Sequence, residues 1–168
     1  MELVYAKFYE GYIDLVKNLS LQEALHTSMV EMKELSEKIN EELADYKYAD
    51  GKWTIRQVIQ HILDAERVFI YRANAFARKD ETPLPAFDED LWAAATISSK
   101  TSIKILVEEL DLLRRSNILF FNSLTDDELY HAGIASNKPI NVKALGYIIA
   151  GHQKHHTNIL KERYLGSL

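Results

Sequence analysis

The stretch Gly151-His152-Gln153-Lys154-His155-His156 decides how this chain folds, because it lies inside a long helical pattern near the C-terminus. Apolar residues and two of these histidines recur at spacings of three and four, which is the periodicity of one face of an α-helix. The recurring positions are Val142, Leu145, Ile149, His152, His156, Ile159 and Arg163. The pattern predicts a helix over residues 141–165 that buries this face against other helices.

His152 and His156 both lie on the buried face of that helix. Residues four positions apart are separated by only about 40° around the helix axis, so the two imidazoles project side by side. Such a pair supplies two adjacent ligands for a transition metal. The alternative is a pair of neutral, hydrogen-bonded core histidines, but every ring nitrogen then needs a partner in an apolar bundle. His155 lies on the shoulder of this face and is the weaker candidate ligand.

Working outward from this helix, three more segments show the same periodicity. Capping boxes, in which a Ser or Thr and a Glu or Gln three residues later satisfy free backbone N–H groups, mark helix starts at Ser20–Glu23, Thr54–Gln57 and Thr125–Glu128. The long helices are expected over residues 21–45, 53–78, 100–123 and 141–165. Four amphipathic helices with short to medium connections predict an all-α four-helix bundle in a single domain, residues 1–168.

The segments between these helices carry weaker signals. The aromatic lead-in before Ser20 could form a short helix that lies across the bundle. Asp88 can cap a short helix over Glu89 to Ala95, and Asn141 can cap the last long helix. The segment from Ala132 to Pro139 reads as a loop, and no run of residues indicates a β-strand convincingly.

The composition excludes several classes of protein. The chain has 168 residues and no cysteine, so it can form neither disulfides nor thiolate metal sites, and it lacks a catalytic thiol of its own. The net charge of −5 argues against a general nucleic-acid binder. Neither a signal peptide nor a membrane-spanning run is visible, which makes a cytoplasmic protein the expectation.

His61 is the natural third partner of the histidine pair. It lies at the edge of the buried face of the second long helix, and bundle cores are where facing helices assemble metal sites. Three histidines with an open fourth position suit catalytic Zn²⁺, and Ni²⁺ or Fe²⁺ also accept imidazole ligands. Whether His61 reaches His152 depends on how the helices pack.

The second and last helices carry a family resemblance. The segment from Lys52 to Arg67, KWTIRQVIQHILDAER, resembles the second-helix signature of the DinB/YfiT-like superfamily. Tyr71-Arg72-Ala73, the segment from Pro83 to Asp88, and the stretch from Gly151 through Leu165 also match. The resemblance extends from about Leu21 to the end of the chain. It implies a four-helix bundle, often dimeric, in which three histidines hold a divalent metal, and these ligands fall on His61, His152 and His156.

The chemistry of this superfamily is more varied than its metal site. The resemblance implies enzymes that use low-molecular-weight thiols such as bacillithiol or mycothiol, including S-transferases that join the thiol to an electrophile. A chain without cysteine fits such a reaction, because the nucleophile comes from the small thiol. Two alternatives remain open. The first is a metal-dependent hydrolase that activates water, and the second is a non-catalytic stress-response protein whose metal only stabilises the bundle.

Several other side chains have both a functional and a structural interpretation. Asp64 could orient His61 or a water on the metal, or could form a salt bridge. Gln153 occupies the position of the glutamate base in the H-E-x-x-H motif, and this difference argues against a protease. Trp53 can pack on Val58 as a hydrophobic staple. Tyr147 and Arg67 either line a pocket or serve packing, Phe87 and Trp92 shape a pocket or a dimer interface, and His26 and His131 are expected to be ordinary surface or edge residues.

Overall fold

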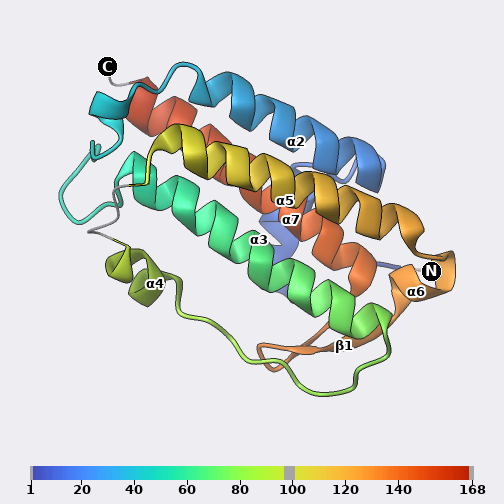
Figure 1. The fold of residues 1–168 in the computed structure, drawn as a ribbon. Coiled ribbons are helices and arrows are strands. Elements are labelled where there is room, and N and C mark those ends of the chain that lie inside the picture. Colours follow the sequence, from blue (N-terminus) through green and yellow to red (C-terminus); the bar gives the residue numbers. More distant parts are fainter. Residues whose placement is uncertain (1, 97–100, 167–168) are drawn as a thin grey trace.

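Four long helices pack side by side in the computed structural model, which describes residues 2–96 and 101–166 (Figure 1). They are α2 (Leu21–Ser36), α3 (Ile55–Ala77), α5 (Ile103–Ser123) and α7 (Val142–Ile159), and α7 continues into the π-helical turn η3 (Leu160–Leu165). The all-α bundle predicted from the sequence is therefore confirmed. Within the described residues, no helix combines the length and hydrophobicity that crossing a membrane requires.

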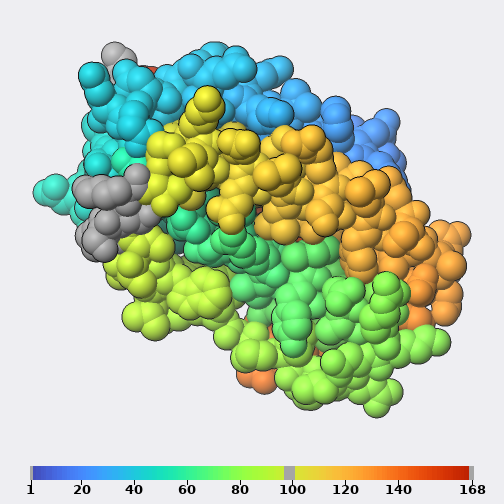
Figure 2. Space-filling model, in the orientation of Figure 1, coloured from blue at the N-terminus to red at the C-terminus, as the bar shows by residue number. Residues whose placement is uncertain are grey.

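The order of the helices around the bundle differs from their order in the chain. α7 packs against α2 and α3, and α5 packs against the same two helices. Consecutive helices α2 and α3 thus lie diagonally opposite each other. In Figure 1, α2 and α7 run in one direction and α3 and α5 in the other, so the chain after α3 must travel back along the bundle before α5 begins. Figure 2 shows α3 and α5 filling one face, with part of this returning connection beneath them.

Helix starts follow the caps read from the sequence. All three predicted capping boxes are formed, at the starts of α2, α3 and the short helix α6 (Asp126–Tyr130). Asn141 accepts a hydrogen bond from the backbone of Ala144 and caps α7. The short helix α4 (Glu89–Ala95) forms as predicted, with Asp88 as its cap. Ser102 caps α5, and residue 100, the expected start of that helix, lies outside the described residues.

The expected end of the first long helix was wrong. α2 stops at Ser36, and a short 3₁₀ helix, η2 (Glu41–Leu43), follows with Asn40 as its cap. The carboxylate of Glu41 accepts hydrogen bonds from Arg56 Nη1 at 2.8 Å and from the backbone of Ile103 at 3.0 Å. These contacts to α3 and α5 hold the chain away from the axis of α2. Long-range contacts therefore decide this boundary.

The expected loop between α6 and α7 is a β-hairpin instead. Strands β1 (Ala132–Ala135) and β2 (Lys138–Asn141) pair antiparallel across a two-residue turn, Ser136-Asn137, in which both residues have positive φ. This is the type I′ geometry, which usually carries Asn-Gly. The strands are only four residues long, and the turn lacks glycine, so the sequence signal was weak. Leu84, from the connection after α3, hydrogen-bonds to the backbone of Ile134 and Ser136 beside β1.

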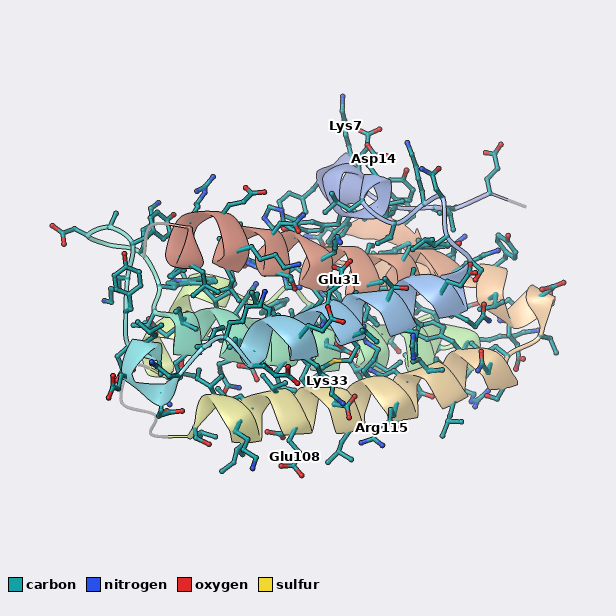
Figure 3. All side chains as sticks on the ribbon, turned by 90° about the horizontal axis from the view of Figure 1, so that it is seen from above. Lys7, Asp14, Glu31, Lys33, Glu108 and Arg115 are labelled. Carbon is teal, nitrogen blue, oxygen red and sulfur yellow. The ribbon has the colours of Figure 1, made fainter. Side chains whose placement is uncertain are left out.

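The aromatic lead-in forms η1 (Lys7–Tyr9) and α1 (Glu10–Asp14), which lie on the outer side of α7 (Figure 3). The approach is close at Gly151, where a Cβ atom would lie 2.1 Å from the backbone oxygen of Tyr12. Only glycine permits this contact. The short helix thereby covers the part of α7 that carries the histidines.

Candidate metal centre

Three histidine side chains converge where α3 meets α7. His152 Nε2 lies 3.0 Å from His61 Nε2 and 3.2 Å from His156 Nε2. One ligand nitrogen from each of the three residues lies within 4.8 Å of the other two. The helical spacing of His152 and His156 sets one side of this triangle, and the packing of α3 against α7 brings in the third imidazole.

Burial keeps these three imidazoles neutral. It lowers the pKa of His61 to about 4, against an ordinary value of 6.5. Burial, reinforced by the neighbouring imidazoles, also holds the pKa values of His152 and His156 well below that range. A neutral imidazole has a lone pair available for a metal, whereas a protonated one has none. The cluster is therefore ready to bind a cation at neutral pH.

The donor set fits a divalent transition ion. Three nitrogens about 2.0–2.1 Å from a tetrahedral ion lie about 3.3 Å from one another, close to the two Nε2 separations in the cluster. The candidate metal-binding group found among the described residues contains these three histidines and no carboxylate. Three imidazoles are typical of a catalytic rather than a structural zinc site.

A cavity of about 440 Å³ opens directly onto the three histidines. This volume lies in the range of small-molecule sites. Aromatic side chains make up much of its wall, together with a few polar residues from the connection after α3 and from the hairpin. The lining comprises Ala6, Phe8, Tyr9, Tyr12, Trp53, His61, Phe69, Arg72, Phe87, Glu89, Ala135, Ser136, Lys138, His152 and His156.

Aromatic rings surround the imidazoles at short distances. The Trp53 ring centroid lies 4.8 Å from that of His61, and Tyr12 packs edge-on against His152 at 5.3 Å. Phe69 contacts the same imidazole at 5.8 Å. Trp53 also packs against the core cluster that contains Val58, so it contacts both the core and the cavity. These rings hold the imidazoles in place and keep the floor of the cavity apolar.

Most of the chain matches a known protein family. The family model of the DinB superfamily covers residues 24–160, most of the chain. The chain belongs to the DinB superfamily. The resemblance carried by the second and last helices is thereby confirmed.

Relatives of this DinB protein include two provisionally named metal-dependent hydrolases. One, from Oceanobacillus iheyensis, is 30% identical over 128 residues, which cover 73% of this chain and 71% of the relative. The other, from Bacillus licheniformis, is 27% identical over 133 residues, covering 77% and 75%.

Two solved Bacillus subtilis structures share the fold. YfiT, described as a probable metal-dependent hydrolase with an unusual four-helix bundle topology, has a TM-score of 0.74 at 22% identity, covering 99% of this chain and 92% of its own. A DinB-like protein has a TM-score of 0.61 at 19% identity, covering 87% and 91%. At these identities the likeness establishes the fold alone.

The remaining residues near the histidines take structural positions. His155 lies outside the group of three, with its ring against Tyr12 at 5.2 Å and against His156 at 5.1 Å. Asp64 accepts hydrogen bonds from Gln60 at 2.9 Å and from Arg67 at 3.0 Å. The salt-bridge interpretation of Asp64 therefore describes its contacts, and its carboxylate does not belong to the candidate metal-binding group.

Gln153 points away from the histidines into a buried polar network. Its amide oxygen accepts a hydrogen bond from Arg114, and its amide nitrogen donates to the backbone oxygen of Ser28 at 2.9 Å. Arg114 also forms two hydrogen bonds of 2.8 Å to the carboxylate of Glu66. In this chain, Gln153 therefore connects α7 to the core, and it does not join the group of three histidines.

The other candidates divide between packing and the cavity. Tyr147 donates a hydrogen bond to the backbone oxygen of Leu19, which supports its packing interpretation. Arg67 pairs with Asp64 and Glu109 on the surface. Phe87 lines the cavity. The ring centroid of Trp92 lies 5.0 Å from that of Phe87, and both residues line an adjacent groove.

Tyr12 and Arg72 are among the cavity residues that received no functional role from the sequence. Tyr12 lies in the aromatic lead-in, whose position on α7 depends on the close contact at Gly151. Arg72 follows His61 by eleven residues, about three helical turns, so both project from the same side of α3. The eleven-residue spacing from His61 could have pointed to Arg72. In the sequence alone, however, an arginine three turns from His61 resembles a surface residue, because only the folded chain shows that the returning connection and the hairpin cover it.

Proposed function

We propose that this DinB protein is a metal-dependent enzyme in which His61, His152 and His156 hold one divalent transition ion, Zn²⁺, Ni²⁺ or Fe²⁺. The observation that carries the proposal is the convergence of three neutral imidazole nitrogens in the wall of a cavity large enough for a small molecule. An ion with a purely structural role would have its fourth coordination position closed by a protein side chain. In this chain, the fourth coordination position of such an ion would face the cavity.

The residues of the cavity define what the chain contributes to a reaction. When bound, the ion supplies Lewis acidity, which makes a thiol or a water molecule nucleophilic at neutral pH. Trp53, Phe69 and Tyr12 exclude bulk water and present flat apolar surfaces to a substrate. Burial raises the pKa of Tyr12, and nearby Glu89 adds to this effect, so its hydroxyl stays protonated.

Transfer of a low-molecular-weight thiol to an electrophile is the reaction that we propose first. Such a reaction needs no general base once the thiol is ionised, and no carboxylate joins the histidine group in the described residues. The absence of cysteine from the chain agrees with a thiol supplied from solution. Hydrolysis is the second candidate, because relatives at 27–30% identity are provisionally named metal-dependent hydrolases.

Parallel assays separate the two reactions. The chain is loaded with Zn²⁺ or Ni²⁺ and incubated with bacillithiol and monobromobimane, or with p-nitrophenyl acetate. We expect the rate of thioether formation to rise above the uncatalysed rate, to require the metal, and to be lost in His152→Ala but kept in His155→Ala. Metal-dependent ester hydrolysis without thiol transfer would favour the second candidate. A chain that binds metal tightly and accelerates neither reaction would support the purely structural role.

We also propose that the chain functions as a cytoplasmic homodimer. Dimerisation is implied by the resemblance to the superfamily and is supported by exposed apolar residues on α5, which include Leu112 and Leu119. A cytoplasmic location suits a thiol-dependent reaction, since free thiols persist in reducing compartments. Sedimentation analysis and fractionation of cells test these two statements directly.

A further inference from the structure

Arg72 is a buried cation in the wall of the candidate active site. Its side chain lines the same cavity as the three histidines, and the residue is only 2% exposed. Its guanidinium lies over the ring of Phe69, 5.9 Å from the centroid. His61, Phe69 and Arg72 thus follow one another along one side of α3, with the first and last about 16 Å apart along the helix axis.

Buried arginines elsewhere in this bundle have carboxylate partners. Arg56 forms ion pairs with Glu41 and Asp45, and Arg114 forms one with Glu66. Arg72 has no ion pair to any carboxylate among the described residues. An uncompensated buried charge is strongly destabilising, and a buried cation without a counter-ion is unusual in a folded protein. Arg72 thus differs from the other two buried arginines, each of which has a carboxylate within ion-pair distance.

The contacts that Arg72 makes hold it in place and leave donors free. Nη2 donates to the backbone oxygen of Pro85 at 2.7 Å and to Ser136 Oγ at 3.1 Å. A guanidinium has five N–H donors, of which Nη2 carries two. The donors on Nε and Nη1 have no hydrogen-bond partner in the described part of the chain, and both nitrogens keep some exposed surface. They are available to a molecule in the cavity.

The residues that clamp Arg72 come from two separate segments. Pro85 belongs to the connection that returns along the bundle after α3, and Ser136 belongs to the hairpin turn. Ser136 has φ of 53°, a strained conformation for a residue other than glycine. Two backbone hydrogen bonds between Leu84 and the hairpin, of 2.9 and 3.0 Å, join these segments. The guanidinium is thus pre-oriented before any ligand binds.

We propose that Arg72 binds a carboxylate on the substrate, and that the substrate is an elongated aromatic or aliphatic carboxylic acid whose reactive end lies at the histidines. One guanidinium balances one negative charge, which matches a carboxylate better than a phosphate. The apolar wall between Arg72 and the histidines fits a hydrocarbon or aromatic body. This inference rests on the proposed function, because it places the substrate of that reaction in this cavity.

A matched pair of ligands tests the proposal. 4-Phenylbutyrate and 4-phenylbutan-1-ol share a body and differ in the charged end, so their relative affinity isolates the carboxylate. Each is titrated calorimetrically into the full metal-free chain, where the carboxylate cannot bind an ion. We expect the acid to bind about tenfold more tightly than the alcohol or better, as a charge-assisted hydrogen bond predicts. Arg72→Gln should abolish this preference, and Arg67→Gln, which changes an exposed arginine five residues earlier on α3, should retain it.

Two results would overturn the proposal. One is an acid that binds no better than the alcohol, or not at all, and the other is a preference that survives in Arg72→Gln. If that variant fails to fold, nuclear Overhauser effects on the unaltered chain supply the answer. The proposal requires the methylene beside the carboxylate to lie near Phe69 and the phenyl ring near Trp53, and the opposite orientation refutes it. Metal content is measured separately, so loss of metal binding and loss of carboxylate preference are distinguishable.

Discussion

At the scale of single residues, the three histidines differ from His155 by position alone. His152 and His156 share the line of contact with α3, whereas the ring of His155 packs on Tyr12 and on the edge of His156. His155 and His156 are therefore adjacent and chemically identical, yet only His156 reaches the place where the three imidazoles meet. This difference makes the metal proposal testable by substitution.

Replacing any one proposed ligand with alanine should lower metal affinity by more than about a hundredfold, since even an outer partner of a ligand is worth about 10- to 100-fold. Elemental analysis after reconstitution and dialysis measures occupancy in His61→Ala, His152→Ala and His156→Ala. His155→Ala and the surface variant His26→Ala are controls that should keep the metal. A His155→Ala protein without metal beside a His156→Ala protein that retains it would contradict the assignment.

Acidification should destabilise the metal-free chain through the same histidines. The pKa of His61 is about 4 in the folded chain and about 6.5 when unfolded. The unfolded state therefore binds more protons as the pH falls, and the free energy of unfolding decreases by about 1.4 kcal/mol per pH unit for each such histidine. Urea denaturation between pH 7 and pH 4 measures this slope, and the slope should be shallower in His61→Gln. Bound metal should be released over the same range.

At the scale of elements, the short helix α1 depends on one glycine of α7. Gly151 lets the backbone of Tyr12 approach so closely that a methyl group has no space. The position of Tyr12 over His152 thus depends on both α1 and α7. Helix α1 has only five residues and would not persist without this contact.

Gly151→Ala should therefore destabilise the chain by about 1–3 kcal/mol, the usual range for forced overpacking. The clash is with backbone, which cannot rotate away, so α1 must move off α7 and uncover the cavity. Gly11→Ala is the matched control, because nothing lies within 4 Å of its added methyl group and alanine favours helix. Chemical denaturation compares the two variants. Equal stability of both would show that α1 does not pack on α7 as described.

At the scale of the whole molecule, one buried network ties the four long helices together. Arg114 of α5 contacts Glu66 of α3, Gln153 of α7, and both Leu25 and Ser28 of α2. The guanidinium of Arg114 is fully buried, and it donates hydrogen bonds to all three neighbouring long helices. The network fixes the register of α7 immediately beside His152, so it contributes to the geometry of the candidate metal site as well as to the bundle.

Arg114→Met should reduce stability by about 3–5 kcal/mol, because it leaves the carboxylate of Glu66 buried without its cation. Arg115→Met is the control, since Arg115 pairs with Asp111 on the surface at 2.8 Å and its side chain is 65% exposed. That exposed pair should contribute less than about 1 kcal/mol. Thermal and urea denaturation measure both variants, and a difference below about 1 kcal/mol between them would contradict the role of the network.

Association between chains should use the outer face of α5. Ile105, Leu112 and Leu119 recur every seven residues on that helix and are 55–71% exposed, and Figure 2 shows α5 crossing this face uncovered. A seven-residue spacing keeps these three side chains on one face of the helix, where the same face of a second chain can pack against them. Leu112→Glu combined with Leu119→Glu should shift a dimer to monomer in sedimentation equilibrium. Phe8→Glu, on the opposite side of the bundle, should leave the association unchanged.

The sequence alone determined the helical class of the fold, most helix starts and the pairing of His152 with His156. Each of these depends on neighbours within four residues, such as Thr54 with Gln57 at a helix start, and local geometry leaves little choice at that range. Asp88 and Asn141 were recognised as caps for the same reason. The helical pattern had already indicated His61, at the edge of a buried face, as the third partner, and the resemblance to the superfamily implies the same three ligands.

Only the tertiary structure decided which segments meet. The end of α2 depends on the contacts of Glu41 with Arg56 and Ile103, and the hairpin depends on Leu84 pairing beside it. The cavity itself forms from several separate segments of the chain, which bring Tyr12 over His152 and enclose Arg72. Contacts between distant segments depend on how whole surfaces pack, and a pattern that repeats every three or four residues carries no information about its partner.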